Sequence, residues 1–271
     1  MEYNSNTIKK LYHGENLVNM TVSTGDTGIP AHLSSWAYDD YGKMTSVVVK
    51  DGDIPAYWQS GNKALSSVTI PNTVTSIGRY AFSELGNYTY GSSSNSYYFD
   101  VSNIDLSGIN KNYSSFVYVF HNSCLKGEIT IPNSIMTQCD SGYTSCAMDM
   151  FYQIGTSKTE PLTINVYANN SIMPRNFVYG DAGKVGVDSG TTVNVYGTPT
   201  FLSGQAFGNF KTGSSVIFHN CTTPPNAPAY DTSYNAPFYS FNGTIYVPSA
   251  GLTAWKNKYT GVADKIQAIP T

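Results

Sequence analysis

The stretch LSSVTIPNTVTSIGRYAF, from Leu65 to Phe82, begins like a β-strand and reaches a proline after only a few extended residues. Proline has no backbone N–H to give to a neighbouring strand, so a strand that meets Pro71 ends there or lies at the edge of a sheet. Val68 and Ile70 point to the same face of such a strand, because strand side chains alternate. Since so short a strand is weak alone, the stretch indicates one unit of a repeat.

The same strand pattern returns along most of the chain. Each copy has a small or polar residue, an apolar residue, a variable residue, a second apolar residue and then a break. The copies are SVVVK (46–50), SVTIP (67–71), NIDLS (103–107), EITIP (128–132), TINVY (163–167), TVNVY (192–196), SVIFH (215–219) and TIYVP (244–248), with NMTVS (19–23) as a doubtful first. The interval between first apolar residues runs from 21 residues (Val47 to Val68) to 36 residues (Val68 to Ile104). Self-similarity at this length is typical of stacked repeat architectures.

The alternation inside these copies predicts the fold. The two apolar residues of each copy share one face, which we expect to be buried, and the residue between them points to the other face. That second face is mostly polar, and we expect it to be solvated; its polar members include Thr69, Asp105, Thr130, Asn165 and Asn194. One strand per unit, one buried face and a long return path predict a β-rich, right-handed solenoid with one short parallel strand per coil.

A second signal follows within most units, where a small or apolar residue stands beside an aromatic one. The pairs are Trp36–Ala37–Tyr38, Ala81–Phe82, Met150–Phe151, Asn176–Phe177, Ala206–Phe207 and Pro237–Phe238. On the return leg of each unit, these aromatic rings would stack on one another along the core. We interpret them as core packing.

Both ends of a stacked array need caps, because its terminal units would otherwise expose the core. Residues 249–271 form the predicted C-terminal cap, a short helix that begins at Ser249 as its N-cap and carries Leu252, Trp255 and Tyr259 at helical spacing. Trp255 is the expected lid on the last unit. Residues 1–18 form the predicted N-terminal docking or capping segment, a small hairpin that turns at Gly14, and residues 19–248 form the repeats between the caps.

The stretch from Leu65 to Phe82 resembles a unit of the BspA-like (Treponema pallidum type) leucine-rich repeats, whose pattern is L-x-x-V-x-I-P-x-x-V-x-x-I-G-x-x-A-F. The positions that match are Leu65, Val68, Ile70, Pro71, Val74, Ile77, Gly78, Ala81 and Phe82. The last 50 or so residues are similar to the way such arrays end, and the resemblance spans roughly residues 20–269, strongly in two places and loosely elsewhere. It implies a leucine-rich-repeat fold and a surface or adhesion role. Tyr- and Ser-rich insertions depart from the pattern between about residues 86 and 160, so unit boundaries stay open there.

The N-terminal sequence IKKLYHGENLVNM (8–20) resembles short modules of bacteriophage virion and tail proteins. The resemblance covers about a dozen residues. It implies that residues 1–18 dock the chain onto other virion proteins.

Composition and charge argue against several classes of protein. The net charge is −3 and the 15 basic residues are scattered, so we expect no nucleic-acid binding. No apolar run approaches the roughly 18 residues of a membrane span, so we expect no membrane insertion. The first residues lack the apolar core of a secretory signal peptide. The four cysteines are too few and too unevenly spaced for a disulfide framework, and we expect mostly buried thiols.

Motifs that carry chemistry are absent from the sequence. There is no nucleophile elbow, phosphate loop, zinc-protease helix or calcium loop. The histidines His13, His32, His121 and His219 fall in different units, and His219 takes the strand-ending position that Pro71 holds in its own unit. We therefore predict no catalysis, no cofactor and no metal.

Two groups of residues are the candidate ligand contacts. Exposed tyrosines could stack on sugar rings while neighbouring polar groups bond their hydroxyls. The first group lies in the insertions and comprises Tyr88, Tyr90, Tyr97, Tyr98, Tyr230 and Tyr234; the second is the polar face of the strands, Thr69, Asp105, Thr130, Asn165 and Asn194.

Three functions remain open from the sequence. The favoured one is a surface-exposed phage virion or tail component that binds a protein or a surface glycan, with a homo-oligomer as a plausible state. The alternative is a bacterial cell-surface or secreted adhesin that binds host protein or glycan. The third, from another class, is a glycan-active enzyme.

Overall fold

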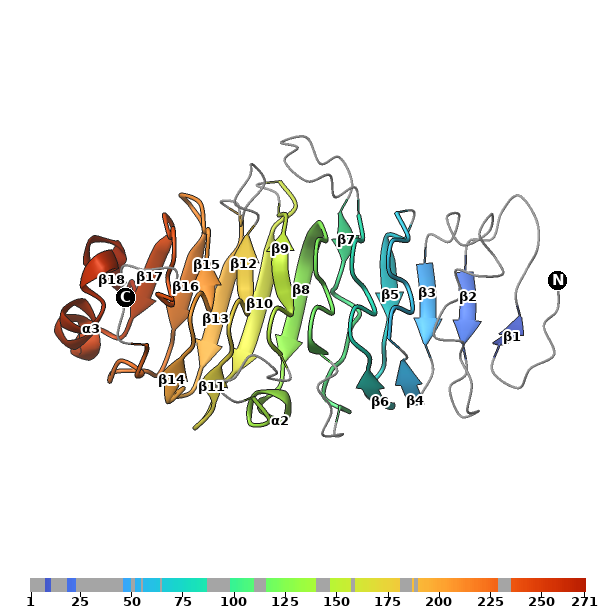
Figure 1. The fold of residues 1–271 in the computed structure, drawn as a ribbon, viewed down its shortest axis with the longest axis horizontal. Coiled ribbons are helices and arrows are strands. Elements are labelled where there is room, and N and C mark those ends of the chain that lie inside the picture. The colour runs from blue at the N-terminus through green and yellow to red at the C-terminus, as the bar shows by residue number, and fades with distance from the viewer. Residues whose placement is uncertain are drawn as a thin grey trace.

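A computed structural model of the chain describes residues 8–10, 19–22, 46–49, 52–54, 56–63, 65–86, 98–109, 116–139, 147–156, 159–180, 187, 190–228 and 235–271. Its strands follow one another along the long axis in chain order, from the N-terminus at one end towards the C-terminus at the other (Figure 1). The molecule is β-rich, and segments one repeat apart in the sequence lie side by side.

One large sheet runs through the described part of the chain. Its paired strands are parallel except β1 with β2, which are antiparallel as in the predicted N-terminal hairpin; Gly14 lies outside the described residues. Its eleven strands, in sheet order, are β1 (Ile8–Lys10), β2 (Asn19–Val22), β3 (Ser46–Val49), β5 (Ser67–Thr69), β7 (Phe99–Asp100), β8 (Leu125–Ile131), β10 (Leu162–Tyr167), β13 (Thr192–Tyr196), β16 (Ser215–Phe218), β17 (Thr244–Val247) and β18 (Ile266–Ala268). Sheet order equals chain order, so each unit adds its strand beside that of the unit before.

The register of this sheet matches the repeat read from the sequence. Val47 lies opposite Val68, and Ile129 lies opposite Ile164. The same apolar position then continues through Val193, Val216 and Ile245. The prediction of parallel strands paired at these positions is confirmed.

The copy at residues 103–107 is where the prediction fails. It forms no strand; Ile104 and Asp105 make only isolated bridges, to Ile70 and Thr130, and the sheet is continued there by β7 instead. A local cause is visible in the side chains: the carboxylate of Asp105 accepts a hydrogen bond from the Ser107 N–H at 2.8 Å. Such local bonds compete with a strand ladder.

The bridge between Ile70 and Ile104 also shifts the register by two residues, since the repeat places Val68 at the position of Ile104. A two-residue shift keeps every side chain on its own face. Thr69 therefore shares the outer face with Asp105 but not its row.

Three smaller sheets pair the return segments, so the prediction of one strand per unit is wrong. They comprise β4 (Gly52–Ile54) with β6 (Val74–Ile77), β11 (Ile172–Met173) with β14 (Phe201–Leu202), and β15 (Phe207–Gly208) with β12 (Val178–Gly180) and β9 (Phe151–Ile154). The strands pair in parallel in all three of these sheets. The physical reason is that buried backbone N–H and C=O groups need partners on the return path as well as in the main sheet.

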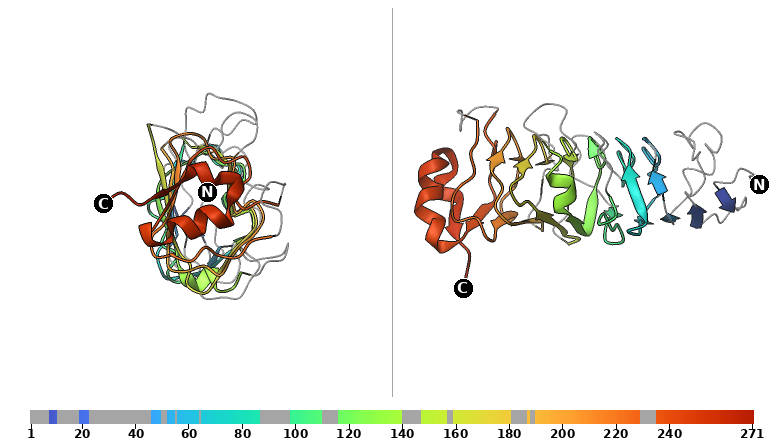
Figure 2. Two further views of the ribbon diagram at one scale, coloured as in Figure 1. Left: turned by 90° about the vertical axis from the view of Figure 1, so that its left-hand side faces the viewer. Right: turned by 90° about the horizontal axis from the view of Figure 1, so that it is seen from below.

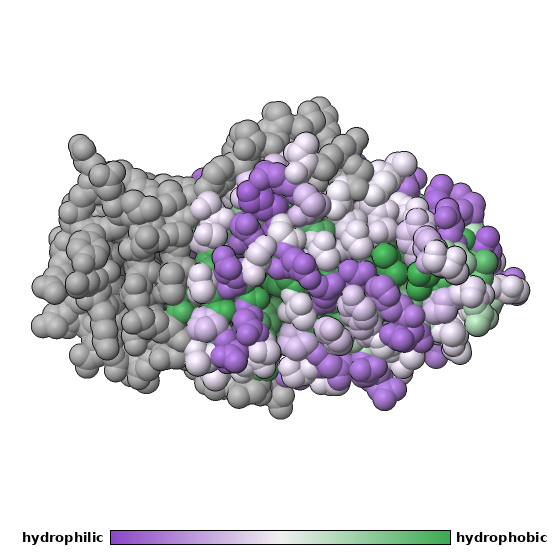
Figure 3. Space-filling view, turned by 180° about the vertical axis from the view of Figure 1, so that it is seen from behind, coloured by the Kyte–Doolittle hydropathy of each residue, from purple (hydrophilic) through white to green (hydrophobic). Residues whose placement is uncertain are grey.

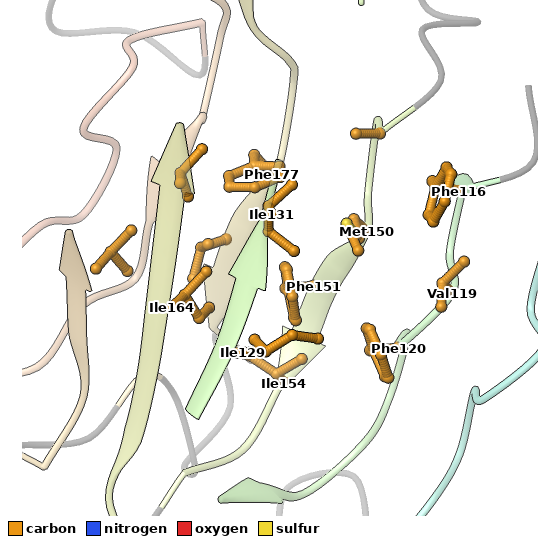
Figure 4. Packing of buried hydrophobic residues seen from close by; sticks show 14 of the residues in the cluster. Phe116, Val119, Phe120, Ile129, Ile131, Met150, Phe151, Ile154, Ile164 and Phe177 are labelled. Atoms are coloured by element: carbon orange, nitrogen blue, oxygen red, sulfur yellow. The ribbon is translucent and has the colours of Figure 1, made fainter. Parts of the chain in front are cut away.

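The core lies between the main sheet and the return segments. Ile129 and Ile164 reach into it from β8 and β10, and Phe151 reaches into it from β9 across the interior (Figure 4). Rings of successive units touch, with centroid distances of 5.9 Å for Phe82–Phe120 and 5.2 Å for Phe120–Phe151. The predicted ring stacking on the return leg is confirmed for these units.

One assignment within that stack is wrong. The β12 residue paired with both Phe151 and Phe207 is Val178, so Phe177 stands one residue before the expected position. Phe177 is nevertheless fully buried and meets Phe151 edge to face at 5.8 Å. The pair Trp36–Ala37–Tyr38 lies outside the described residues.

The return leg turns in the same way in unit after unit. At this turn the backbone has a left-handed φ of about +48° to +61°. The residues at this turn position are Tyr57, Tyr80, Tyr118, Asp149, Asn176 and Gln205. The buried ring follows two residues later in four units, and directly as Trp58 and Phe177 in the other two. Non-glycine residues rarely adopt this conformation, and Asn and Asp do so most easily.

The C-terminal end is closed by short helices, which lie across the end of the strands in the end-on view (Figure 2). They are η3 (Ser249–Gly251), α3 (Leu252–Lys258) and η4 (Thr260–Lys265); a further short helix, α2 (Asn133–Met136), follows β8. Trp255 is fully buried, as predicted for a lid, with its ring 4.6 Å from Phe218.

The predicted N-cap at Ser249 is wrong. Ser249 begins the 3-10 turn η3, the cap position of α3 is Gly251, and neither helix has a side-chain cap hydrogen bond. Buried hydrogen bonds hold the cap instead: Trp255 Nε1 donates to the Cys221 carbonyl and the Tyr259 hydroxyl donates to the Pro225 carbonyl, both at 2.8 Å.

Candidate functional site

The outer face of strands β8, β10, β13 and β16 carries the best-formed group of polar side chains, and we call it the sheet face. Residues of these strands alternate between buried and accessible, as a half-buried strand requires. Because neighbouring strands pair in register, accessible residues line up in rows across the strands. The rows are Glu128–Thr163–Thr192–Ser215, Thr130–Asn165–Asn194–Ile217, and Tyr167–Tyr196 followed by His219.

Hydrogen bonds between side chains join the first two rows into one ladder. Asn165 Nδ2 donates to Glu128 Oε1 at 2.6 Å, and Asn194 Nδ2 donates to Asn165 Oδ1 at 3.0 Å. His219 Nε2 lies 2.9 Å from Asn194 Oδ1. We call these four residues the amide ladder.

The amide ladder has a fixed direction. A carboxylate can only accept hydrogen bonds, so Glu128 requires Asn165 to present its NH₂ group. The oxygen of Asn165 then accepts from Asn194, whose own oxygen is left to accept from His219. His219 must therefore carry a proton on Nε2, which leaves Nδ1 as an acceptor when the ring is neutral.

An aromatic row lies beside the ladder on the same face. The rings of Tyr167 and Tyr196 stack at a centroid distance of 5.1 Å, and those of Tyr196 and His219 stack at 4.5 Å. Tyr167 ends the row and is 44% exposed, more than any other large apolar or aromatic side chain in the described residues. Aromatic and hydrogen-bonding groups thus share one surface.

A pocket of about 460 Å³ opens at the β8 end of the sheet face. Its described lining residues include two carboxylates, Asp105 and Glu128, and none of them is basic. The lining residues are Ser102, Ile104, Asp105, Leu106, Ser107, Glu128, Thr130 and Pro132. Nearby, Lys126 is paired with Glu160 at 2.5 Å, so its charge is already matched.

The structure brings together most of the residues predicted on the strands. Asp105 and Thr130 are exposed and bridge one another, while Asn165 and Asn194 are half-buried in the ladder. Thr69 is exposed but lies two residues out of their row. Among the predicted tyrosines, Tyr98 is half-buried just before β7; Tyr88, Tyr90, Tyr97, Tyr230 and Tyr234 lie outside the described residues.

Sequence reasoning missed Glu128, Tyr167, Tyr196 and His219 as part of this face. A signal was present: three successive strand copies, TINVY, TVNVY and SVIFH, end on an aromatic ring at the same position. Because that position also marks the end of each strand, its aromatic residues were not recognised as a row.

A second aromatic surface lies on the return leg, across the core from the main sheet; we call it the tyrosine strip. Tyr57, Tyr80 and Tyr118 stack in turn at 4.9 and 4.7 Å, and His121, Tyr152 and Tyr179 continue the strip at 5.5 and 5.1 Å. The two runs of rings meet edge to face, with the ring centroids of Tyr118 and His121 5.2 Å apart. Tyr57 is the most exposed of them, at 39%.

A buried carboxylate stands where the first stack ends. Asp149 occupies the next turn position and accepts a hydrogen bond from Asn176 Nδ2 at 2.7 Å. Burial raises the pKa of Asp149, although Asn176, Tyr118 and Arg175 oppose that rise. Burial, together with the negative charge of Asp149, raises the pKa of Tyr118 to about 12. These contacts account for the strip as packing.

We expect His219 to make the stability of the protein depend on pH. Burial lowers the pKa of His219 in the folded protein. In the unfolded chain the pKa is about 6.5, so the unfolded chain binds the second proton of the ring more readily than the folded protein does. Stability contributed by the neutral ring is therefore complete above about pH 6.5 and is lost as the pH falls towards the lowered folded pKa. Thermal melts of wild type and His219→Gln between pH 8 and pH 5 measure this.

The His219→Gln variant should lose less stability than the wild type on acidification, because glutamine can still donate to Asn194 but does not titrate. Burial also lowers the pKa of His121. Because His121 is present in both proteins, the difference between their losses of stability on acidification reports on His219. Parallel losses in both proteins would contradict the prediction.

Other sites are not evident in the described residues. No group of three or more His, Cys, Asp or Glu side chains there could hold a metal ion, and no helix there has the length and apolarity to cross a membrane. The side chains of Cys124, Cys139 and Cys221 are buried, and Cys146 lies outside the described residues. Seen from behind, hydrophobic residues form only a narrow, broken band among polar ones (Figure 3).

No model of a known protein family matches the chain, and no curated protein sequence matches it either. A proposal of function therefore rests on the repeat, the register and the sheet face.

Proposed function

We propose that this chain is a non-catalytic binding protein, built as a right-handed leucine-rich-repeat solenoid of the BspA-like kind, that recognises a protein or surface glycan through its sheet face. The match of Leu65 to Phe82 to the repeat pattern and the parallel strands in chain order support the solenoid. Parallel crossovers are almost always right-handed, which supports the hand.

The observation that carries the proposal is the sheet face itself. Polar and aromatic side chains occupy equivalent positions on four neighbouring strands, and hydrogen bonds hold Asn165 and Asn194 in place. Preordered polar groups beside exposed rings are what a recognition surface needs, because little side-chain entropy is then lost on binding. The described residues offer no comparably arranged nucleophile, base or metal ligands, and we propose no enzymatic role.

The setting we favour is a surface-exposed phage virion or tail component, in which residues 1–18 dock onto other virion proteins and the repeats project outward. The resemblance of IKKLYHGENLVNM (8–20) to virion modules supports it. Mass spectrometry of purified particles of the parent phage should then detect the chain. A coding sequence with a signal peptide upstream of Met1 would favour the alternative, a bacterial adhesin.

The sheet face can be tested by removing it. The triple variant Asn165→Ala, Asn194→Ala and Tyr167→Ala should bind intact host cells at least tenfold more weakly than wild type, measured with fluorescently labelled protein. Tyr57→Ala is the matched control, since it removes a similarly exposed tyrosine from the opposite wall and should change binding less than twofold. Unchanged binding by the folded triple variant would exclude the sheet face as the recognition surface.

A further inference from the structure

The pocket beside β8 carries more information about the ligand than the rest of the sheet face does. We infer that it takes part of an uncharged, hydroxyl-rich sugar chain, with the hydroxyl groups of one unit donating to Asp105 and Glu128 in the pocket and a following unit stacked on Tyr167. The inference rests on the proposed function, because it names the ligand class of the same face.

The carboxylates define what the pocket can bind. One oxygen of Asp105 accepts the Ser107 N–H, and Glu128 Oε1 accepts from Asn165. Each carboxylate has about four acceptor positions, so both keep capacity for a ligand. A partner must therefore donate hydrogen bonds, as sugar hydroxyls do.

The negative charge of the pocket narrows the class of ligand further. The described lining residues include Asp105 and Glu128 but no lysine or arginine, and the nearby Lys126 is paired with Glu160. An acidic sugar or a sulfate ester would face two like charges, and no described lining residue supplies a cation to offset them. A neutral sugar meets no such repulsion.

The aromatic row supplies the second half of a sugar site. Tyr196 covers one face of the Tyr167 ring, so the other face looks towards β8. Tyr167 follows Val166, which is paired with Ile131, and Ile131 is followed by Pro132, a lining residue of the pocket. The second ring face is therefore directed to the side where the pocket lies, and Tyr167 as a whole is 44% exposed.

Size is consistent with this assignment. A volume of about 460 Å³ lies within the range of about 300–1,000 Å³ found for small-molecule sites. A basic peptide side chain would also satisfy carboxylates and an aromatic face. Two neutral groups favour a sugar chain, because they continue across the sheet as uncharged donors and acceptors. They are the hydroxyl row of Thr163, Thr192 and Ser215 and the side-chain amides of Asn165 and Asn194.

The test uses the full chain on an array of matched glycans, each neutral oligosaccharide beside its sialylated or sulfated form, followed by calorimetry with the best neutral one. We expect neutral forms to bind at least tenfold more tightly than their acidic partners. In the double variant Asp105→Asn and Glu128→Gln, the preference for neutral over acidic glycans should fall to threefold or less. Glutamine at position 128 keeps an acceptor for Asn165, so the amide ladder is retained.

Two further variants examine the ring. Tyr167→Ala should weaken neutral glycan binding at least tenfold, whereas Tyr167→Phe, which keeps the stacking face, should stay within twofold. Tyr57→Ala should also stay within twofold. Circular dichroism of each variant establishes that it is folded.

The outcomes separate this inference from the proposed function. Preference for acidic glycans, or no glycan binding by folded wild type, overturns the sugar assignment. Binding of a Lys- and Arg-rich peptide that is lost with the carboxylates also overturns it, while leaving the sheet face as a protein-binding surface. Glycan binding that survives both the carboxylate and Tyr167→Ala changes overturns the pocket, and if it also survives the triple sheet-face variant, it overturns the proposed function.

Discussion

Replacing Trp255 by alanine is expected to lower the free energy of unfolding by about 3–5 kcal/mol, the usual cost of deleting a large buried ring. Trp255 has no exposed surface, contacts Phe218 and Tyr259, and donates its Nε1 hydrogen to the Cys221 carbonyl. Its loss would open the end of the core to water and leave that carbonyl without its donor. Urea denaturation followed by circular dichroism measures the change.

The neighbouring exposed residue provides the control for this experiment. Lys256→Ala alters the same helix without touching the core and should change stability by less than about 0.5 kcal/mol. Trp255→Phe should fall between the two, because it keeps a ring but loses the hydrogen bond. A loss below about 1 kcal/mol for Trp255→Ala would show that this residue does not close the core.

Phe120→Ala, a change in the middle of the molecule, is also expected to lower the free energy of unfolding by about 3–5 kcal/mol. Its ring lies between Phe82 and Phe151, so alanine would leave a cavity that removes packing from both neighbouring units. Phe120→Leu, which fills most of that space, should cost less than half as much. Thermal and urea unfolding of the three proteins provide the comparison.

The two variants should also differ in what they disturb. Hydrogen exchange should increase mainly near residues 215–271 in Trp255→Ala, and on both sides of residue 120 in Phe120→Ala, because contacts are made chiefly between neighbouring units. Equal exchange changes along the whole chain in both variants would contradict this expectation.

The strands of the main sheet could be predicted because their signal is physical and local. Alternation decides which residues are buried, and Pro71, Pro132 and Pro248 mark where a strand must end. The same logic placed Thr130 next to Asp105 and Asn165 next to Asn194, and both pairings occur. These residues were found by position within a unit, before any contact was known.

The return segments could not be read in the same way. Strands of two to four residues, such as β11 and β14, are too short to display a period. The position of Val178 in the ring stack and the left-handed turns at Tyr57, Tyr80 and Tyr118 depend on contacts with neighbouring units. The start of the C-terminal helix at Leu252 likewise followed backbone turns rather than the cap that Ser249 suggested.

Only part of the candidate site could be predicted, because the other residues depend on partners from neighbouring strands. Amide and hydroxyl side chains on the middle strand position were identified, but the ring of His219 was interpreted as a strand end. Its role depends on Asn194 and Tyr196, which lie on the neighbouring strand and become its partners only after pairing. Similarly, Glu128 stands before the first apolar residue of its copy, so the pattern of middle positions, which pairs Asp105 with Thr130, does not include it.

The two-residue slip between Ile70 and Ile104 sets a limit on the length of anything that lies straight across the sheet. At about 3.3 Å per residue, it displaces the rows on either side by roughly 7 Å along the strands. The row that begins at Asp105 therefore has no straight continuation through Thr69. From Asp105 to Asn194 this row spans three strand spacings, roughly 14 Å. A rigid, straight ligand that follows the row must end at the register shift, and a longer ligand must bend there.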